Sequence, residues 1–292
     1  MKIHFWKMEA CGNDFLVVDS VRERGVGALN SHQVAQICDR NFGVGADGLV
    51  VLHGGTSTNA RWEFFNADGS EAEMCGNAAR CSILFLADRY FANERVISLM
   101  TAAGVVKGKK LGPGLAEVSV VARSNPELRY EDRVTVVDGV GTVRAHFIDT
   151  GVPHAVIEVD SIETYPIVQV GRALRFNPIF GPKGANVTFF QKTAGNAIYC
   201  TTYERGVENE TLSCGTGAVA AANIFSETYL QSLPITVRVP GGELVVDMSP
   251  VSRVVLLRGP ANYVFDGEFP MGDRPYKKVH LYSHSRQLKY EK

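Results

Sequence analysis

The sequence has no excess of charge of either sign. It carries 30 Lys+Arg against 31 Asp+Glu over 292 residues, a formal net charge of −1. Nucleic-acid binders and membrane-surface proteins usually carry a basic excess, so neither class is expected. No apolar run approaches the roughly 20 residues of a membrane-spanning helix. The N-terminal residues lack the basic and apolar regions of a secretory signal. The sequence therefore predicts a cytoplasmic protein without a nucleic-acid or membrane partner.

The cysteine pattern lacks the spacing of a metal site. No CxxC pair is present, and Cys75 and Cys81 lie six residues apart with no histidine nearby. On one helix these side chains would point about 240° apart, which is the wrong geometry for a shared ion. In a reducing compartment the cysteines are expected to be thiols. We therefore predict neither a bound metal nor a disulfide framework.

What the sequence does contain is an internal repeat with an offset of 139 residues. Segment 64–80 (FFNADGSEAEMCGNAAR) resembles segment 203–219 (YERGVENETLSCGTGAV), and Cys75 falls on Cys214. The same offset places Gly12 on Gly151, at the start of GNDFLVVDS and GVPHAVIEVDS. Two similar pairs in the same order indicate a duplicated domain.

The predicted elements also divide into two halves. Residues 123–133 are polar and contain a proline, so we place the join there, between an N-terminal half (1–125) and a C-terminal half (126–270). Residues 271–292 are expected to be a tail that is solvated or returns to the N-terminal half. Strands are expected at 15–18, 49–52, 117–121, 134–137, 155–159, 235–239 and 254–257. Helices are expected at 78–91 and 218–230.

Each predicted helix begins directly after a Cys-Gly pair, Cys75-Gly76 or Cys214-Gly215. A helix N-terminus offers unpaired N–H groups and a partial positive charge, which suit a carboxylate. The same field favours a thiolate. Two such cysteines at equivalent positions of a repeat indicate that both thiols face one cleft. The alternative is that both are small buried residues at helix ends, because free cysteine is commonly buried.

Two thiols on opposite faces of one carbon atom can invert a stereocentre. A thiolate removes the α-proton of a bound amino acid, and the opposing thiol delivers a proton to the other face. Preorganised N–H donors in a water-excluded site stabilise the intermediate. The expected partner is thus a small amino-acid substrate, and no cofactor is required.

These residues resemble the diaminopimelate epimerase family, cofactor-independent enzymes with two catalytic cysteines, over about residues 1–270. The matching strings are KMEACGNDF (7–15), NFGVGADGL (41–49), FFNADGSEAEMCGNAARC (64–81), TGVPH (150–154), GANVTF (184–189) and YERGVENETLSCGTGA (203–218). The resemblance implies an α+β fold of two pseudo-symmetric domains, each wrapping a twisted mixed sheet around a central helix. It also implies a homodimer that interconverts LL- and meso-diaminopimelate in lysine and peptidoglycan biosynthesis.

The resemblance further implies roles for individual residues. Cys75 and Cys214 look like the two acid/base thiols, and His154 and Glu204 resemble residues that orient and tune them. Substrate contacts are implied for Asn13, Asn66, Gly76, Asn77, Asn186, Glu204, Arg205, Gly215 and Thr216. The guanidinium of Arg205 also suits bidentate recognition of a carboxylate on chemical grounds alone.

Three departures from the family's usual pattern leave the exact substrate range open. Glu9 and Ala10 stand where the family commonly has His-Gly, and Val152 replaces the Asn of Asn-Pro-His. The loop at 206–211 is one residue longer than usual. All three are expected near the distal end of the substrate, away from the reacting carbon.

Other functions and structural roles stay open. A related two-cysteine racemase could act on proline, hydroxyproline or histidine, although proline-type enzymes usually have Cys-Gly-His where this chain has Cys75-Gly76-Asn77. A catalytically silent amino-acid-binding protein is a second alternative, which the intact cysteine pair disfavours. His154 is as often a structural residue as a functional one, and Asn186 could be a turn residue.

Overall fold

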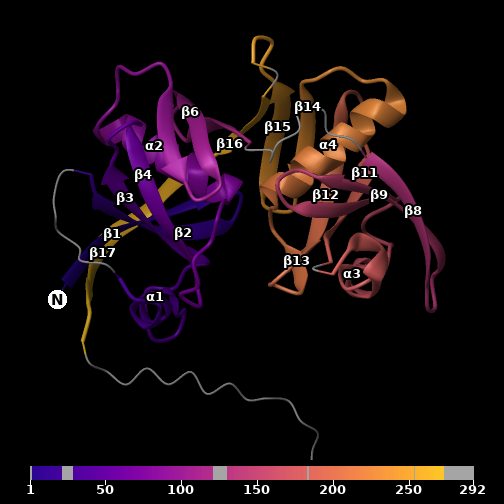
Figure 1. The fold of residues 1–292 in the computed structure, drawn as a ribbon, viewed down its shortest axis with the longest axis horizontal. Coiled ribbons are helices and arrows are strands. Elements are labelled where there is room, and N and C mark those ends of the chain that lie inside the picture. The colour runs from indigo at the N-terminus through magenta and orange to yellow at the C-terminus, as the bar shows by residue number, and fades with distance from the viewer. Residues whose placement is uncertain (1, 22–28, 121–129, 183, 253, 273–292) are drawn as a thin grey trace, which may run out of the picture.

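The computed structural model describes residues 2–21, 29–120, 130–182, 184–252 and 254–272, which form two halves side by side (Figure 1). The first half contains β1 (Lys2–Ala10), β2 (Asn13–Ser20), α1 (Ser31–Cys38), β3 (Gly48–Gly54), β4 (Ala60–Asn66), α2 (Gly76–Arg89), β5 (Ile97–Thr101), β6 (Gly104–Gly112) and β7 (Leu115–Ser119). The second contains β8 (Tyr130–Val137), β9 (Gly141–Asp149), β10 (Pro153–Glu158), α3 (Ile167–Arg175), η1 (Pro178–Phe180), β11 (Asn186–Lys192), β12 (Ala197–Glu204), β13 (Asn209–Thr211), α4 (Gly215–Tyr229), β14 (Ile235–Val239), β15 (Gly242–Met248) and β16 (Val255–Pro260). The last strand is β17 (Asn262–Pro270).

The strands of the two halves pair in the same way, which confirms the predicted duplication. The first half has the order β17-β1-β2-β3-β4-β5-β6-β7. The second has the order β8-β9-β10-β11-β12-β14-β15-β16. The parallel pairs fall at equivalent places, β2–β3 and β4–β5 in one half, β10–β11 and β12–β14 in the other. The antiparallel pair β7–β16 joins the two halves into one sheet.

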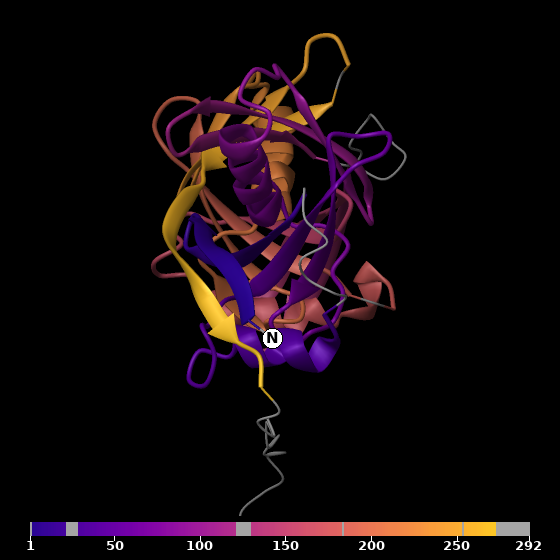
Figure 2. The ribbon, with the colours of Figure 1, turned by 90° about the vertical axis from the view of Figure 1, so that its left-hand side faces the viewer.

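The last strand of the chain pairs with the first strand, in the sheet of the first half. β17, which the predicted boundaries assign to the second half, pairs along β1 with Lys2 opposite Pro270. Figure 2 shows this strand in yellow beside the indigo N-terminal strand. The predicted join at residues 125 and 126, and residues 273–292 of the predicted tail, lie outside the described residues.

Helices α2 and α4 are the cores of their halves, and both predicted helices are confirmed. From Asn77 to Ala87 every residue of α2 is buried, and α4 is buried from Gly217 to Ala222. A helix that packs against strands on all sides has no need of a polar face. α2 packs against β1, β6 and β7, and α4 against β11, β12 and β14. The sheets therefore hold both helix N-termini in fixed positions.

Candidate active site

The N-termini of α2 and α4 meet at Gly76 and Gly215. A Cβ atom added to Gly215 would lie 3.7 Å from the Cα atom of Gly76 and 3.0 Å from Cδ2 of Leu257. The residues immediately before them, Cys75 and Cys214, have extended backbone with φ of −145° and −118° and make no side-chain cap. The unpaired N–H groups of both helix ends therefore lie close together, and such groups suit a carboxylate.

The first thiol lies beside two asparagines. Sγ of Cys75 is 3.8 Å from Oδ1 of Asn13, and the same oxygen accepts a hydrogen bond from Nδ2 of Asn77 at 3.0 Å. Asn77 also donates to the carbonyl of Ser213 at 3.2 Å. Because Ser213 precedes Cys214, Asn77 links the segments that carry the two thiols. Asn13 in turn donates to Asp47 at 2.7 Å, which fixes its amide group.

The second thiol begins a chain of hydroxyl and imidazole groups. Sγ of Cys214 is 3.5 Å from Oγ1 of Thr216, and this hydroxyl is 3.0 Å from Nε2 of His154. Nδ1 of His154 is 2.9 Å from Oγ1 of Thr188. The hydroxyl of Thr188 is 3.1 Å from that of Thr202 on the neighbouring strand. His154 is fully buried, and its hydrogen bonds lead to Cys214 through the hydroxyl of Thr216.

The hydrogen bonds around Asn186 assign the tautomer of His154. Oδ1 of Asn186 accepts from the backbone N–H of Arg205 at 2.8 Å, so the amide nitrogen faces Nε2 of His154 at 3.4 Å. An amide nitrogen can only donate, so Nε2 accepts and Nδ1 carries the hydrogen. Burial, and then the charge of Arg205, lowers the pKa of His154 to about 3. The imidazole is therefore neutral at physiological pH.

Glu204, at the end of β12, acts electrostatically on both thiols. Burial is the main cause that raises the pKa of Cys75 and of Cys214, and the charge of Glu204 raises both further. Backbone N–H groups of the first helical turns oppose this effect at each thiol. Burial also raises the pKa of the Glu204 carboxyl. Glu204 is therefore a carboxyl group whose charge acts on both thiols.

Arg205 and Asn66 occupy equivalent positions of the repeat, at the ends of β12 and β4. Among the described residues, the half-buried guanidinium of Arg205 has no hydrogen-bond or ion-pair partner. Asn66 is exposed and donates to Oγ of Ser70 at 3.0 Å. Neither side chain contacts a cysteine, so both are available for a more distant part of a ligand.

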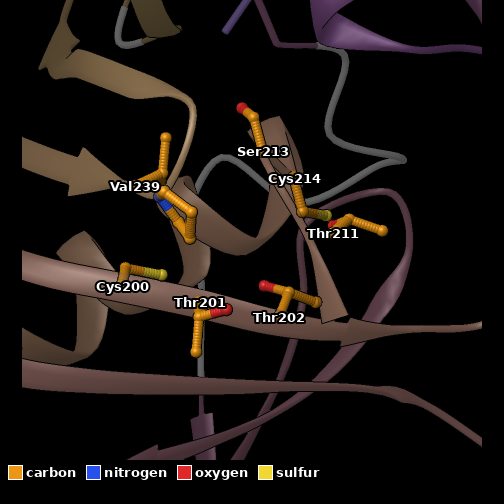
Figure 3. A pocket seen from close by; sticks show the side chains of 8 residues that line it. Cys200, Thr201, Thr202, Thr211, Ser213, Cys214 and Val239 are labelled. Carbon is orange, nitrogen blue, oxygen red and sulfur yellow. The ribbon is translucent and has the colours of Figure 1, made fainter. Parts of the chain in front are cut away.

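A small cavity lies behind Cys214 (Figure 3). Residues of β12 and β13, the segment before α4 and the end of β14 with the residue after it line the cavity: Cys200, Thr201, Thr202, Thr211, Ser213, Cys214, Val239 and Pro240. A Cβ atom at Gly217 would lie 2.5 Å from Oγ1 of Thr202. Glycine at this position therefore lets the first turn of α4 pack directly against β12.

The described part of the chain contains no group of three or more His, Cys, Asp or Glu side chains arranged to hold a metal ion. All six cysteines are free thiols. None of the described helices combines the length and apolar character needed to cross a membrane.

Comparison with known proteins identifies the family. The family model described as diaminopimelate epimerase matches residues 5–122 and 146–264. The chain belongs to this family. The diaminopimelate epimerase of Aquifex aeolicus is 39% identical over 280 residues, covering 91% of this chain and 97% of the relative. That of Archaeoglobus fulgidus is 36% identical, covering 94% and 99%. A hydroxyproline epimerase structure from Agrobacterium vitis superposes with a TM-score of 0.69 at 15% identity, covering 91% and 92%, which shows a shared fold.

All three departures from the diaminopimelate epimerase pattern have structural contacts. In the loop at 206–211, the carboxylate of Glu208 accepts hydrogen bonds from Nε of Arg175 at 3.0 Å and from the N–H of Gly206 at 3.1 Å. Glu9 accepts hydrogen bonds from the N–H of Gly12 at 2.9 Å and from the amide of Asn262 at 2.6 Å. It thereby stabilises a two-residue turn between β1 and β2 in which Cys11 and Gly12 have φ of 52° and 79°. Such paired positive φ angles are typical of a type I′ hairpin turn. The carbonyl of Val152 accepts from the N–H of Thr150 at 3.2 Å.

Several residues that position the site were not predicted from the sequence. Asp47 accepts a hydrogen bond from Asn13, and Thr188 forms a hydrogen bond with His154. Both lie inside strings that resemble the diaminopimelate epimerase family, NFGVGADGL and GANVTF, so those strings were the available signal. Arg80, a charged residue within the buried stretch of α2 from Asn77 to Ala87, was a second signal.

Proposed function

We propose that this protein is a cofactor-independent epimerase that interconverts LL- and meso-diaminopimelate by acid/base catalysis at Cys75 and Cys214. The observation that supports the proposal is the contact between the N-termini of α2 and α4 at Gly76 and Gly215, the residues that directly follow Cys75 and Cys214. Membership of the diaminopimelate epimerase family supports the choice of substrate over proline, hydroxyproline or histidine.

In the proposed reaction the two helix N-termini bind the carboxylate next to the reacting carbon. Backbone N–H groups at Gly76 and Gly215, with those of Asn77 and Thr216, donate to this carboxylate and stabilise the negative charge that develops on it. One sulfur, as thiolate, removes the α-proton. The other sulfur, as thiol, gives a proton to the opposite face, so the configuration inverts.

The test is incubation with LL-diaminopimelate in D₂O. The thiol that protonates the intermediate exchanges its hydrogen with solvent in the free enzyme. Early product should therefore carry deuterium at the inverted carbon, while recovered substrate stays mostly protiated. Parallel incubations with proline, hydroxyproline and histidine test the alternative substrates. Binding without α-proton exchange on any of them would overturn the proposal.

The pH profile of kcat/KM should be bell-shaped, with its optimum above pH 7. The reaction needs one thiolate and one thiol. Below the first pKa both cysteines are protonated and no base is present, so activity rises as that proton leaves and falls as the second leaves. Burial raises the pKa of both thiols, which moves both limbs upward. Initial rates across pH 6 to 10, with a substrate isotope effect to identify the proton-transfer step, measure this. A flat profile under those conditions would contradict it.

Arg205→Ala should lower kcat/KM for diaminopimelate by about 10- to 150-fold, because a lost charge-assisted hydrogen bond costs about 1.5–3 kcal/mol. We propose that Arg205 and Asn66 bind the unreacting carboxylate, and the free guanidinium of Arg205 supports this. Arg172→Ala, at an exposed position of α3, is the control. Equal losses on diaminopimelate and on a short amino acid would place Arg205 outside the distal pocket.

We also propose that the protein acts as a homodimer in the cytoplasm, where reducing conditions keep both thiols free. Among the described strands, β17 pairs only with β1, so its other edge is open. Tyr263, Val264 and Phe265 on this strand are 40%, 54% and 47% exposed. An open apolar edge strand suits pairing with a second copy. Sedimentation measures the molecular mass of the wild type, which should be that of a dimer, and of Val264→Lys, which should be that of a monomer. A monomer mass for both proteins would contradict the proposal.

A further inference from the structure

Two asparagine side chains beside Cys75 lie between a carboxylate and a guanidinium. Nδ2 of Asn13 donates to Oδ2 of Asp47 at 2.7 Å, and Oδ1 of Asn13 accepts from Nδ2 of Asn77 at 3.0 Å. Oδ1 of Asn77 in turn accepts from Nη2 of Arg80 at 2.7 Å. Sγ of Cys75 is 3.8 Å from Oδ1 of Asn13, so the first thiol lies against this line of hydrogen bonds.

The two ends of the line permit one orientation of each amide. A carboxylate only accepts hydrogen bonds and a guanidinium only donates them, whereas an amide has a donating nitrogen and an accepting oxygen. Asp47 therefore directs the amide nitrogen of Asn13 toward itself, and Arg80 directs the amide oxygen of Asn77 toward itself. The other ends of the two amides then meet as acceptor and donor. If Asn13 alone were reversed, its oxygen would face a carboxylate and its nitrogen would face another donor.

Arg40 and Asp14 hold the carboxylate of Asp47 in place. Oδ1 of Asp47 accepts from Nη2 of Arg40 at 2.7 Å, and Oδ2 accepts from the N–H of Asp14 at 3.2 Å. The N–H of Asp47 donates to Oδ1 of Asp14 at 3.0 Å. Arg40 also binds both carboxylate oxygens of Asp14, at 2.7 and 3.0 Å. A bidentate arginine fixes the geometry of its partners, so these contacts keep Oδ2 of Asp47 directed at Asn13.

The guanidinium of Arg80 is fully buried at the opposite end of the line. Its Nε donates to the carbonyl of Pro260 at 3.3 Å, and Nη1 donates to that of Gly76 at 3.4 Å. Arginine stays protonated in proteins, so Arg80 is a permanent donor to Asn77. Asn77 is itself 1% exposed, which leaves protein groups rather than solvent to orient its amide.

The position of Asp47 has a counterpart in the second half of the repeat. At the offset of 139 residues Asp47 falls on Asn186, the first residue of β11. Nδ2 of Asn186 lies 3.4 Å from Nε2 of His154, the imidazole that Thr216 links to the second thiol. In each half this position therefore orients a polar group that is next to the thiol or linked to it. The residue of the first half differs because a carboxylate can only accept.

We propose that Asp47 is a positioning residue that acts on Cys75 through Asn13, because its carboxylate keeps a carbonyl oxygen, and not an NH₂ group, against the sulfur. The proposal rests on the two-cysteine function above and adds a residue to it. An NH₂ group at this place would donate to the thiolate and make it a weaker base. An oxygen accepts the S–H hydrogen of the thiol, and it leaves the thiolate free to take the α-proton.

The test is a double-mutant cycle on kcat/KM for diaminopimelate, with Asp47→Asn, Asn13→Ala and the double variant. Asp47→Asn keeps the size of the side chain, but while its oxygen faces Arg40 its NH₂ group faces Asn13. It should lower kcat/KM about 10- to 100-fold, since a small misplacement at reacting groups has effects of this size. In the Asn13→Ala background the same change should alter kcat/KM by less than about twofold, because residues that act together are not additive.

Asp47→Ala should lose less activity than Asp47→Asn, although it removes more atoms. Without a donor at this position, Asn77 and Arg80 still hold the amide of Asn13 in its native orientation. A role of Asp47 in packing alone would give the opposite order, because asparagine keeps the shape of the side chain.

Glu63→Gln is the matched control. Glu63 on β4 is 39% exposed against 43% for Asp47, and its ion pairs are with Arg61 and His53. This variant should leave kcat/KM unchanged in both backgrounds.

An Asp47→Asn variant with near wild-type kcat/KM, or one with equal losses in both backgrounds, would overturn the proposal. If Asp47→Asn does not fold, as judged by circular dichroism, the cycle with Asp47→Ala decides by the same criterion of equal or unequal losses. Failure of the two-cysteine function is seen separately, as epimerisation that survives removal of either sulfur.

Discussion

Changing Cys75 or Cys214 to alanine should abolish inversion, with kcat/KM falling about 100-fold to 10,000-fold, because one face of the α-carbon then has no proton carrier. Both cysteines lie at the ends of buried helices without capping them, so their loss leaves the helix hydrogen bonds intact. The measurement is the initial rate of meso-diaminopimelate formation, with circular dichroism to show that each variant is folded.

The matched control removes a buried thiol elsewhere. Cys38 is 2% exposed at the end of α1, in a separate core cluster from either catalytic helix. Cys38→Ala should therefore lose stability but keep kcat/KM near the wild-type value. Serine at Cys75 or Cys214 should rescue little, since a hydroxyl is far less acidic than a thiol. Near wild-type turnover by either alanine variant would contradict the paired-cysteine mechanism.

The sequence was sufficient to predict those features of the fold that repeat locally. The offset between Cys75 and Cys214 predicted the duplication, and the Cys-Gly pairs predicted where α2 and α4 begin. These signals depend on short segments with clear periodicity or on direct similarity between two segments.

The contacts that complete the sheet and the site could not be predicted in this way. The pairing of β17 with β1 and of β16 with β7 joins segments far apart in the chain. Alternation of apolar residues shows that a strand exists but does not name its partner. The position of Arg80 was visible in the sequence, but its contacts with the carbonyl of Pro260 at 3.3 Å and with Sγ of Cys11 at 3.9 Å join segments that are far apart in the chain.

The second large effect is expected from a substitution at Gly241, where a turn of the second half contacts the hairpin of the first half. Gly241, in the turn between β14 and β15, donates its N–H to the carbonyl of Leu212 at 2.8 Å. An added Cβ atom would lie 1.9 Å from the carbonyl oxygen of Cys11 and 3.0 Å from that of Leu212. Cys11 belongs to the hairpin that carries Asn13, and Leu212 lies just before Cys214. One methyl group here would therefore push apart the segments that hold both thiols.

Gly241→Ala should destabilise the protein by about 1–3 kcal/mol, because backbone atoms on both sides must move. It should also lower kcat/KM by roughly 100-fold, since a displacement of about 1 Å at reacting groups has this effect. Thermal unfolding and initial rates measure the two. Gly112→Ala is the control, because an added Cβ atom there meets nothing within 4 Å. If Gly241→Ala kept full activity, the hairpin and the segment before α4 would not need their close fit, and the positions of Asn13 and Cys214 would be set by the sheets alone.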